Sequence, residues 1–290
     1  MGQVDGNAQK LYPIWQFVES NLEKDLGLNQ IAFFSNYSNW HFHRLFKKSQ
    51  GENIQSYIRR LKIEKAAYEL KISQFPILEI AMEAGYESNE AFTKAFKKQM
   101  GLTPTQFRKK FQKHFKVKKD IIKLECPDGL KLFEFQIKTI QKFQIVYIRH
   151  IGAYSKLPGP IPNSKEVKTL LSVIQKINSV PENHKWVGVS KDDPKISKPN
   201  TIRFDLGFTV GSDFMDFSQL GIQTIEGGRH LQIRYRGSYK NLPKIYNFLL
   251  EDYLPTTKLK LRNVPPWECY LNPLEKNLDL CTTDIYLPIH

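Results

Sequence analysis

The stretch from Ser38 to Lys48 carries side chains suited to recognising nucleic acid. At helical spacing, Phe42, Leu45 and Phe46 fall on one face and predict a buried stripe. A second face is aromatic and basic, a combination that is unfavourable for a surface in contact only with water. Such a face suits a DNA major groove, which is partly apolar and strongly anionic. The predicted DNA contacts of this stretch are Asn39, Trp40, His43, Arg44, Lys47 and Lys48.

The stretch from Ser88 to Lys98 repeats the pattern. Phe92, Ala95 and Phe96 take the core positions, and the outward positions again predict DNA contacts: Asn89, Glu90, Thr93, Lys94, Lys97 and Lys98. Asn36 and Gly85 lie in the turns before the two copies, and both residue types tolerate positive φ. A helix, a short turn and a serine-capped second helix make a helix-turn-helix, so two are predicted in tandem.

Each of these side chains has a structural alternative to DNA contact. Trp40 would then pack on a neighbouring helix, Arg44 would pair with an acid, and the lysines would only keep the surface solvated. We favour base or phosphate contact, in which Arg44 binds O6 and N7 of guanine and Trp40 contacts a thymine methyl or a sugar. Glu90 is assigned first as an acid favoured by the helix dipole, with acceptance from cytosine N4 as the alternative.

These helices need a scaffold, and the periodicity of the chain predicts one. Residues 54–71 form a long helix that would act as a rigid spacer, Pro76 starts a helix over 77–84, and Pro104 opens a short final helix. After the basic run 109–119 the apolar residues alternate instead, which predicts strands. Strands are expected at 132–137, 144–149, 186–189, 203–210, 221–225, 229–236, 267–271 and 281–287, with helices at 165–178 and 239–254.

The second part of the chain also contains a repeat. The run from Ile148 to Pro158 resembles the run from Ile233 to Pro243, with Ile, Arg, Gly, Tyr, Leu and Pro at matching places. The simplest interpretation is a duplicated β-β-α-β-β unit with a ligand-sized cleft between its halves. The predicted fold is therefore all-α and then α+β, with a tandem helix-turn-helix domain at 8–112, a linker at 113–122 and a second domain at 123–290.

Composition narrows the possible functions. The chain has 290 residues and a net charge of +14, which raises the odds of a nucleic-acid partner. Its three cysteines, Cys126, Cys269 and Cys281, lack CxxC spacing, which argues against a disulfide framework or a structural zinc and favours a reducing interior. The polar start and the lack of a long apolar run predict no signal peptide and no membrane span. His41 and His43 do not share a helical face, and the nucleotide-binding and hydrolase motifs are absent, so no metal, cofactor or catalytic residue is expected.

The first domain resembles the AraC/XylS family of transcription regulators, in particular the Mar/Sox/Rob group. The matching pieces are Tyr37-Ser38-x-Trp40-His41-x-x-Arg44-x-Phe46-Lys47-Lys48, Ile80-Ala81-x-x-x-Gly85-Tyr86-x-Ser88, and Gly101-x-Thr103-Pro104-x-x-Phe107-Arg108. Two positions depart from the pattern. Asn36 stands where the family usually has glycine, and Glu90 stands where this group has an amide. The resemblance therefore does not tell which bases are recognised by the second helix-turn-helix, called here the second head, as the one that contains Trp40 is called the first head.

Residues from about 121 to 290 resemble the GyrI-like effector domain, through Tyr147-Ile148-Arg149-His150-x-Gly152-x-Tyr154, Gly227-Gly228-Arg229 and Trp267-Glu268-Cys269-Tyr270-Leu271-Asn272. Strand alternation places Glu268 and Tyr270 on one face, where a carboxylate beside an aromatic ring suits a lipophilic cation. The resemblance implies the same role for a glutamate at this place. The alternative is that Glu268 pairs with an arginine such as Arg149 or Arg234. Weaker ligand candidates are Tyr147, Tyr154 and Trp186, since large aromatics are more often core.

Together these features predict a cytoplasmic, nucleoid-associated, sequence-specific regulator that is not an enzyme. Its two heads would enter adjacent major grooves of double-stranded DNA, its second domain would bind a small, lipophilic cationic effector, and RNA polymerase would be a further partner. Two rivals concern the second domain. It would be either a hydrolase of electrophilic toxicants that uses Glu268, or a module that binds only a protein.

Overall fold

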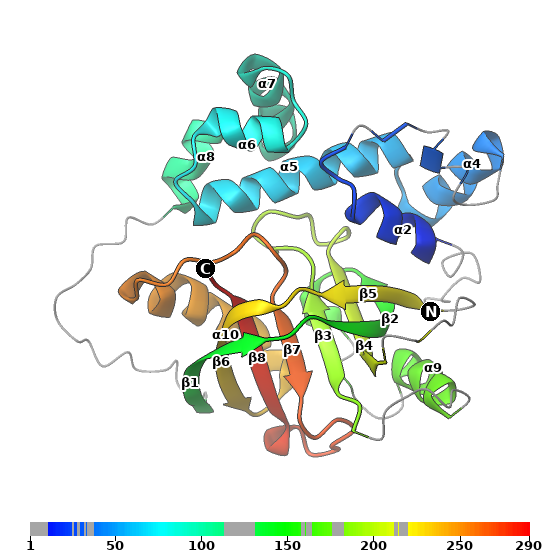
Figure 1. The fold of residues 1–290 in the computed structure, drawn as a ribbon, viewed down its shortest axis with the longest axis vertical. Coiled ribbons are helices and arrows are strands. Elements are labelled where there is room, and N and C mark those ends of the chain that lie inside the picture. The colour runs from blue at the N-terminus through cyan, green and yellow to red at the C-terminus, as the bar shows by residue number, and fades with distance from the viewer. Residues whose placement is uncertain are drawn as a thin grey trace. The chain divides into compact units, whose positions relative to one another are not determined.

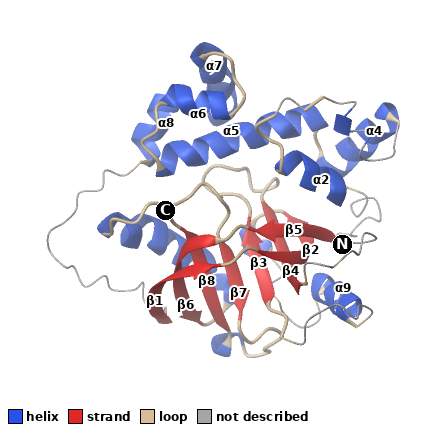
Figure 2. Ribbon diagram, in the orientation of Figure 1, coloured by secondary structure: helices blue, strands red, loops and turns tan. Residues whose placement is uncertain are grey.

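The computed structural model describes residues 11–24, 26–27, 30–31, 33, 38–112, 131–157, 160, 164–175, 183–211, 214 and 220–290, with backbone only at 131–133. The chain divides into two compact units, one built on the first 112 residues and one on a single sheet (Figure 1). Every described strand belongs to one sheet, drawn red in Figure 2. The predicted linker at 113–122 lies outside the described residues.

The helical unit is arranged around one long helix. Its helices are α2 (Tyr12–Glu19), α4 (Asn39–Gln50), α5 (Ile54–Ile72), α6 (Ile77–Glu83), α7 (Asn89–Met100) and α8 (Pro104–Phe111). The long helix α5 begins where the Asn53 side chain accepts a hydrogen bond from the backbone N–H of Ser56, and α8 begins with a capping box of Thr103 and Gln106. The predicted boundaries of α5 and α6 are confirmed to within one residue, and α7 begins directly after the predicted capping serine, Ser88.

The tandem repeat packs its two copies by the same aromatic contacts. In the first copy Phe46 lies against Phe42 and Tyr57, with ring centroids 5.8 and 5.3 Å apart. In the second copy the corresponding rings are Phe92, Phe96 and Phe107, with centroids 5.5 and 5.3 Å apart. These rings are buried, so each recognition helix is fixed by its apolar face. Most of the residues directly before the first copy, where the helix-turn-helix pattern requires a leading helix, and the turn residue Asn36 lie outside the described residues.

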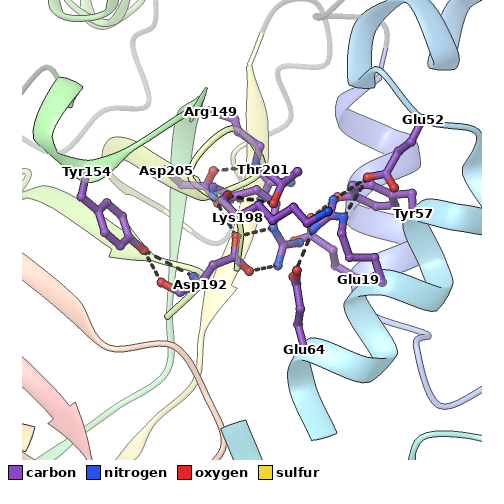
Figure 3. Close-up of polar contacts among 12 residues, drawn as sticks. Glu19, Glu52, Tyr57, Glu64, Arg149, Tyr154, Asp192, Lys198, Thr201 and Asp205 are labelled. Atoms are coloured by element: carbon purple, nitrogen blue, oxygen red, sulfur yellow. Dashed lines mark hydrogen bonds and ion pairs between the residues drawn. The ribbon is translucent and has the colours of Figure 1, made fainter. Parts of the chain in front are cut away.

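Polar contacts add to this packing. The Tyr57 hydroxyl donates to a carboxylate oxygen of Glu19 at 3.2 Å, and Arg60 forms ion pairs with Glu52 and Glu64 at 2.7 and 3.1 Å. Figure 3 labels Glu19, Glu52, Tyr57 and Glu64, which take part in these contacts. Because Tyr57 and Arg60 both lie on α5, these contacts join α5 to α2 and to the residues that precede it.

The second unit is an eight-stranded antiparallel sheet made from two copies of one motif. Its elements are β1 (Lys131–Ile140), β2 (Phe143–Ile151), α9 (Lys165–Ile174), β3 (Trp186–Ser190) and β4 (Arg203–Val210), followed by β5 (Gly221–Ile225), β6 (Gly228–Arg236), α10 (Leu242–Phe248), β7 (Trp267–Tyr270) and β8 (Thr282–Pro288). The order across the sheet is β1-β6-β8-β7-β3-β4-β2-β5. Matching β1–β4 with β5–β8 makes this order the same from either end, so the duplicated β-β-α-β-β fold is confirmed, with its pseudo-twofold axis between β3 and β7.

One predicted helix of this unit is irregular. The segment 239–254 consists of a 3₁₀ turn at Tyr239–Asn241, the helix α10, a π-helical turn at Leu249–Tyr253 and a 3₁₀ turn at Leu254–Thr256. Pro255 has no backbone N–H to continue a helical ladder, and the last turn ends one residue later, at Thr256. The helix predicted at 165–178 is described as far as Gln175.

Two arginine–aspartate pairs mark equivalent places in the two halves. Arg149 on β2 faces Asp205 on β4, with Nε and Nη2 donating to the two carboxylate oxygens at 2.7 and 2.8 Å. Figure 3 shows this pair side by side. Arg234 on β6 faces Asp284 on β8 in the same way, at 2.7 and 2.9 Å. Both pairs join directly opposite residues of neighbouring strands and therefore fix the register of the sheet.

Candidate functional site

The first candidate interface is the outward face of α4. The Ser38 hydroxyl caps the helix by accepting from the backbone N–H of His41 at 3.4 Å, and Gly51 ends the helix at φ 73°. Trp40 is 69% exposed, so it does not pack inward on a neighbouring helix. All six residues predicted to contact DNA on this helix are exposed: Asn39, Trp40, His43, Arg44, Lys47 and Lys48.

The equivalent face of α7 lies on a helix that begins and ends in the same way as α4 but carries different side chains. The Ser88 hydroxyl accepts from the backbone N–H of Ala91 at 3.1 Å, and Gly101 ends the helix at φ 75°. Five of the predicted contacts on α7 are exposed and Thr93 is half-buried; the exposed ones are Asn89, Glu90, Lys94, Lys97 and Lys98. The two helices therefore present matched surfaces, and their contact with DNA stays a prediction.

The second candidate site is a buried carboxylate at the centre of the sheet. Glu268 on β7 is 2% exposed and stands directly opposite Gly188 on β3, beside the pseudo-twofold axis. The hydroxyl of Tyr270 donates to its Oε2 at 2.6 Å, and the hydroxyl of Tyr246, on α10, donates to its Oε1 at 3.1 Å. Both carboxylate oxygens thus face phenol donors rather than a cation.

Burial controls the ionisation of this group. Removal from water raises the pKa of Glu268 to about 7, and the hydrogen bonds from Tyr270 and Tyr246 limit that rise. Burial, together with the neighbouring carboxylate, raises the pKa of both tyrosines well above its usual value. The tyrosines therefore remain hydrogen-bond donors at neutral pH, while Glu268 is divided between its two protonation states.

The pairing of Glu268 with an arginine is wrong. Arg149 is occupied by Asp205, and Arg234 by Asp284 and Glu134. Within the part of the chain that the structure describes, Glu268 forms no ion pair. An ionised Glu268 would therefore be a buried negative charge without a cationic neighbour, which is unfavourable unless a ligand supplies one.

The other sequence-predicted ligand residues are only partly gathered around Glu268. Trp186 lies opposite Tyr270 in the register and is 3% exposed. Tyr154 donates to the backbone oxygen of Asp192 at 2.6 Å (Figure 3), and the charge of Glu268 contributes to the rise of its pKa, after burial and Asp192. Tyr147 lies on the opposite face of the sheet, beneath the guanidinium of Arg149 at 5.5 Å.

Two residues of the site were not predicted from the sequence. Tyr246 approaches Glu268 from α10, and no local pattern distinguishes it from other helical tyrosines. Gly188 does carry a signal, because glycine inside a strand often marks a close approach of another group. A Cβ at Gly188 would lie 2.4 Å from the Tyr270 hydroxyl and 2.6 Å from Cζ of Phe204. The space that Tyr270 needs to reach Glu268 thus depends on this glycine.

Replacing Gly188 by alanine is expected to displace the Tyr270 hydroxyl and to destabilise the second unit by about 1–3 kcal/mol, the usual cost of overpacking. Thermal denaturation of the full chain would measure the loss. The double variant Gly188→Ala with Tyr270→Phe removes one of the clashing atoms and should recover part of it. A Gly188→Ala protein as stable as the unaltered chain would contradict the packing described here.

Among the residues that the structure describes, no group of three or more His, Cys, Asp or Glu side chains lies close enough together to hold a metal ion. No described helix combines the length and apolar character that crossing a membrane requires.

Each of the two units matches a known protein domain. The pattern of the GyrI-like small molecule binding domain matches residues 133–290, and that of a helix-turn-helix domain matches residues 31–110. The C-terminal domain of AraT, a response regulator from Geobacillus stearothermophilus, is 31% identical with a TM-score of 0.35, covering 36% of this chain and 87% of that one.

Two curated relatives match the helical unit. The right origin-binding protein of Escherichia coli K12 is 40% identical over 96 residues, which are 33% of this chain but only 32% of that protein. The multiple antibiotic resistance protein MarA of the same organism is 36% identical over 108 residues, which are 37% of this chain and 85% of MarA. Since the GyrI-like match spans more than half of the chain and the MarA match spans most of MarA, the chain belongs to the GyrI-like small molecule binding family and carries an AraC-type helix-turn-helix domain.

Proposed function

We propose that this protein is a sequence-specific DNA-binding regulator of transcription whose activity responds to a small molecule. The observation that carries the proposal is the repetition of one exposed, serine-capped and basic helix face on α4 and α7. A relative named transcriptional regulator Rob, from Salmonella typhimurium, is 40% identical over 96 residues and supports the same conclusion. The protein would act in the cytoplasm on the nucleoid, with RNA polymerase as a downstream partner.

The spacing of the two heads suits adjacent major grooves. The spacer α5 has 19 residues, which at about 1.5 Å per residue is about 28 Å of helix. Successive major grooves on one face of a duplex lie about 34 Å apart, a distance that α5 and its flanking turns can span. Because both heads are on one chain, a monomer would read an asymmetric site. Exposed lysines would hold phosphates, and residues near each helix start would read bases.

The buried carboxylate favours a lipophilic cation as the effector. A cation would neutralise Glu268, and aromatic rings such as Tyr270 and Trp186 offer apolar and cation–π contact. A neutral ligand of the same shape would leave the ionised carboxylate uncompensated. We therefore propose an amphipathic organic cation, without assigning its identity.

One experiment tests both the sequence-specific DNA binding and the cationic effector. The full chain is incubated with a pool of random duplexes, with and without tetraphenylphosphonium, and the bound duplexes are sequenced. The expected product is a bipartite motif whose halves lie about one helical turn apart, together with a change in recovery when the cation is present. Triphenylphosphine oxide, which is neutral and similar in size, is the control. Recovery of random sequence would reject the regulator, and identical responses to both compounds would reject a cationic effector.

Glu90 allows a separate test of the second head. Replacing Glu90 by glutamine removes a negative charge from the exposed face of α7, and we expect non-specific DNA binding to tighten roughly two- to fivefold at low salt, as for other surface charge effects of up to about 1 kcal/mol. Fluorescence anisotropy on a random duplex measures the affinity. Glu226→Gln makes the same charge change at an exposed position of the second unit and should alter binding less. Equal effects of the two variants would contradict a DNA-facing Glu90.

A second candidate function for the GyrI-like unit is hydrolysis of an electrophile. It is favoured by one observation, a glutamate whose pKa is about 7 and which shares hydrogen bonds with two tyrosines, an arrangement able to activate water. Turnover of a reactive electrophile by the full chain, abolished in Glu268→Gln, would support this function. Binding of cations without any turnover would leave the sensor as the better assignment.

A further inference from the structure

Arg44 lies over the indole ring of Trp40 in the free protein. Both residues are on α4, one turn apart, and Cζ of Arg44 is 4.6 Å from the centroid of the Trp40 ring. Both side chains are exposed, and among the described residues neither forms an ion pair or hydrogen bond. Among the described residues, the guanidinium is therefore in contact with the ring and is not paired with an acid.

This arrangement suits an arginine that has to recognise a base. A guanidinium that contacts a ring through its face rather than through hydrogen bonds keeps its N–H groups free, so that they can reach the two acceptors of a guanine. A long side chain loses rotamer freedom when it binds, and a side chain already held in one place loses less. The attraction between ring and cation also grows when water is excluded, as it would be in a DNA groove.

The second head lacks this arrangement. At the places equivalent to Trp40 and Arg44 it has Glu90 and Lys94, again one turn apart on an exposed helix face. A carboxylate one turn before a lysine attracts it and offsets its charge, and it offers no flat surface. The ring is therefore a feature of the first head rather than a general requirement of the repeated fold.

We propose that Trp40 is a positioning residue that holds Arg44 for base recognition, so that its contribution to specificity acts through Arg44. The inference rests on the proposed DNA-binding function. It differs from the expectation that Trp40 contributes mainly through its own contact with a thymine methyl or a sugar, because that contact would persist without Arg44.

A double-mutant cycle separates these two roles. The full-length variants Trp40→Ala, Arg44→Ala and the double variant are compared on a duplex selected from the random pool and on a scrambled duplex, by fluorescence anisotropy. The readout is the ratio of specific to non-specific affinity. Arg44→Ala should lower this ratio about 5- to 150-fold, the range of one bidentate base contact. Trp40→Ala should lower it roughly three- to tenfold in the unaltered chain and much less when Arg44 is already alanine.

Three further variants serve as controls. Trp40→Phe retains a ring face and should keep the ratio within about threefold of the unaltered chain, whereas Trp40→Leu should resemble Trp40→Ala. Lys47→Ala removes an exposed cation of the same helix, and its effect should add to that of Arg44→Ala. Since all these side chains are exposed, thermal denaturation should give unchanged midpoints.

Each outcome bears on a different claim. Equal effects of Trp40→Ala in both backgrounds, or a Trp40→Phe protein as poor as Trp40→Ala, would overturn the positioning role. A selected motif that Arg44→Ala reads as well as the unaltered chain would overturn it too. If the unaltered chain selects no motif, the proposed function fails instead.

Discussion

Asparagine in place of Asp205 is expected to lower the free energy of unfolding of the second unit by about 3–5 kcal/mol, the usual cost of breaking a buried ion pair. Arg149 and Asp205 are only 1% and 0% exposed at their side chains, and two hydrogen bonds of 2.7 and 2.8 Å join them. Asparagine has nearly the same shape but no charge, so the buried guanidinium would lose the carboxylate that now faces it. Urea denaturation of the full chain, followed by circular dichroism, measures the loss.

The pseudo-twofold axis supplies a matched control. Asp284 is the counterpart of Asp205, and Arg234 is the counterpart of Arg149. Arg234 is 31% exposed and has a second acid, Glu134, at 3.1 Å, so after Asp284→Asn it would keep both water and a partner. We expect a cost below about 2 kcal/mol for Asp284→Asn. Equal costs for the two variants would mean that burial does not decide the contribution of these pairs.

Local periodicity was sufficient to predict the helices of the first unit and their buried faces. The bounds of α7, and the burial of Phe92 and Phe96 in it, follow from helical spacing and from a capping serine at Ser88. The same logic places Trp40 outside, because its neighbours Phe42 and Phe46 already define the buried face. Such features depend on residues within one or two turns, and a sequence contains that information directly.

The carboxylate site depended on contacts that are distant in sequence. Alternation along β7 correctly placed Glu268 and Tyr270 on one face of the sheet. Alternation within β2 cannot tell whether Tyr147 lies on the same face of the sheet as Glu268 and Tyr270. That depends on how β2 is paired with β4, β4 with β3, and β3 with β7. Tyr246 was missed for the same reason, since it reaches Glu268 only once α10 packs on the sheet. The duplicated motif predicted the pseudo-twofold symmetry of the strand order, but it could not predict that Gly188 takes the place opposite the carboxylate. The ligand-sized cleft between the halves stays a prediction.

Glu268→Gln is expected to weaken the binding of a lipophilic cation by about 2–5 kcal/mol, or about thirtyfold and more, because the ligand would lose its counter-charge. Glutamine keeps the size of the side chain and can still accept a tyrosine hydrogen bond, so the fold should persist. Isothermal titration with tetraphenylphosphonium measures the affinity, and triphenylphosphine oxide should bind both proteins alike. Equal affinity of the two proteins for the cation would remove Glu268 from the site.

The same carboxylate should make binding depend on pH. With a pKa of about 7, Glu268 is mostly protonated at pH 6 and mostly ionised at pH 8, so cation affinity should rise about tenfold between these values and stay flat in Glu268→Gln. Stability without ligand should change in the opposite sense. A carboxyl whose pKa is higher in the folded state than in the unfolded state loses stabilisation as pH rises from the unfolded value to the folded one.

Tyr270→Phe separates the charge of this site from its hydrogen bonds. Removing one donor to Oε2 leaves the carboxylate less stabilised, so the midpoint of the pH dependence should move above 7 while the slope remains. An effector bound by shape alone would give the same affinity at every pH in all three proteins. If the cation binds through Glu268, the pH midpoint of its affinity must shift when the Tyr270 hydroxyl is removed. The reason is that the cost of burying the negative charge and the gain from neutralising it arise at the same two carboxylate oxygen atoms.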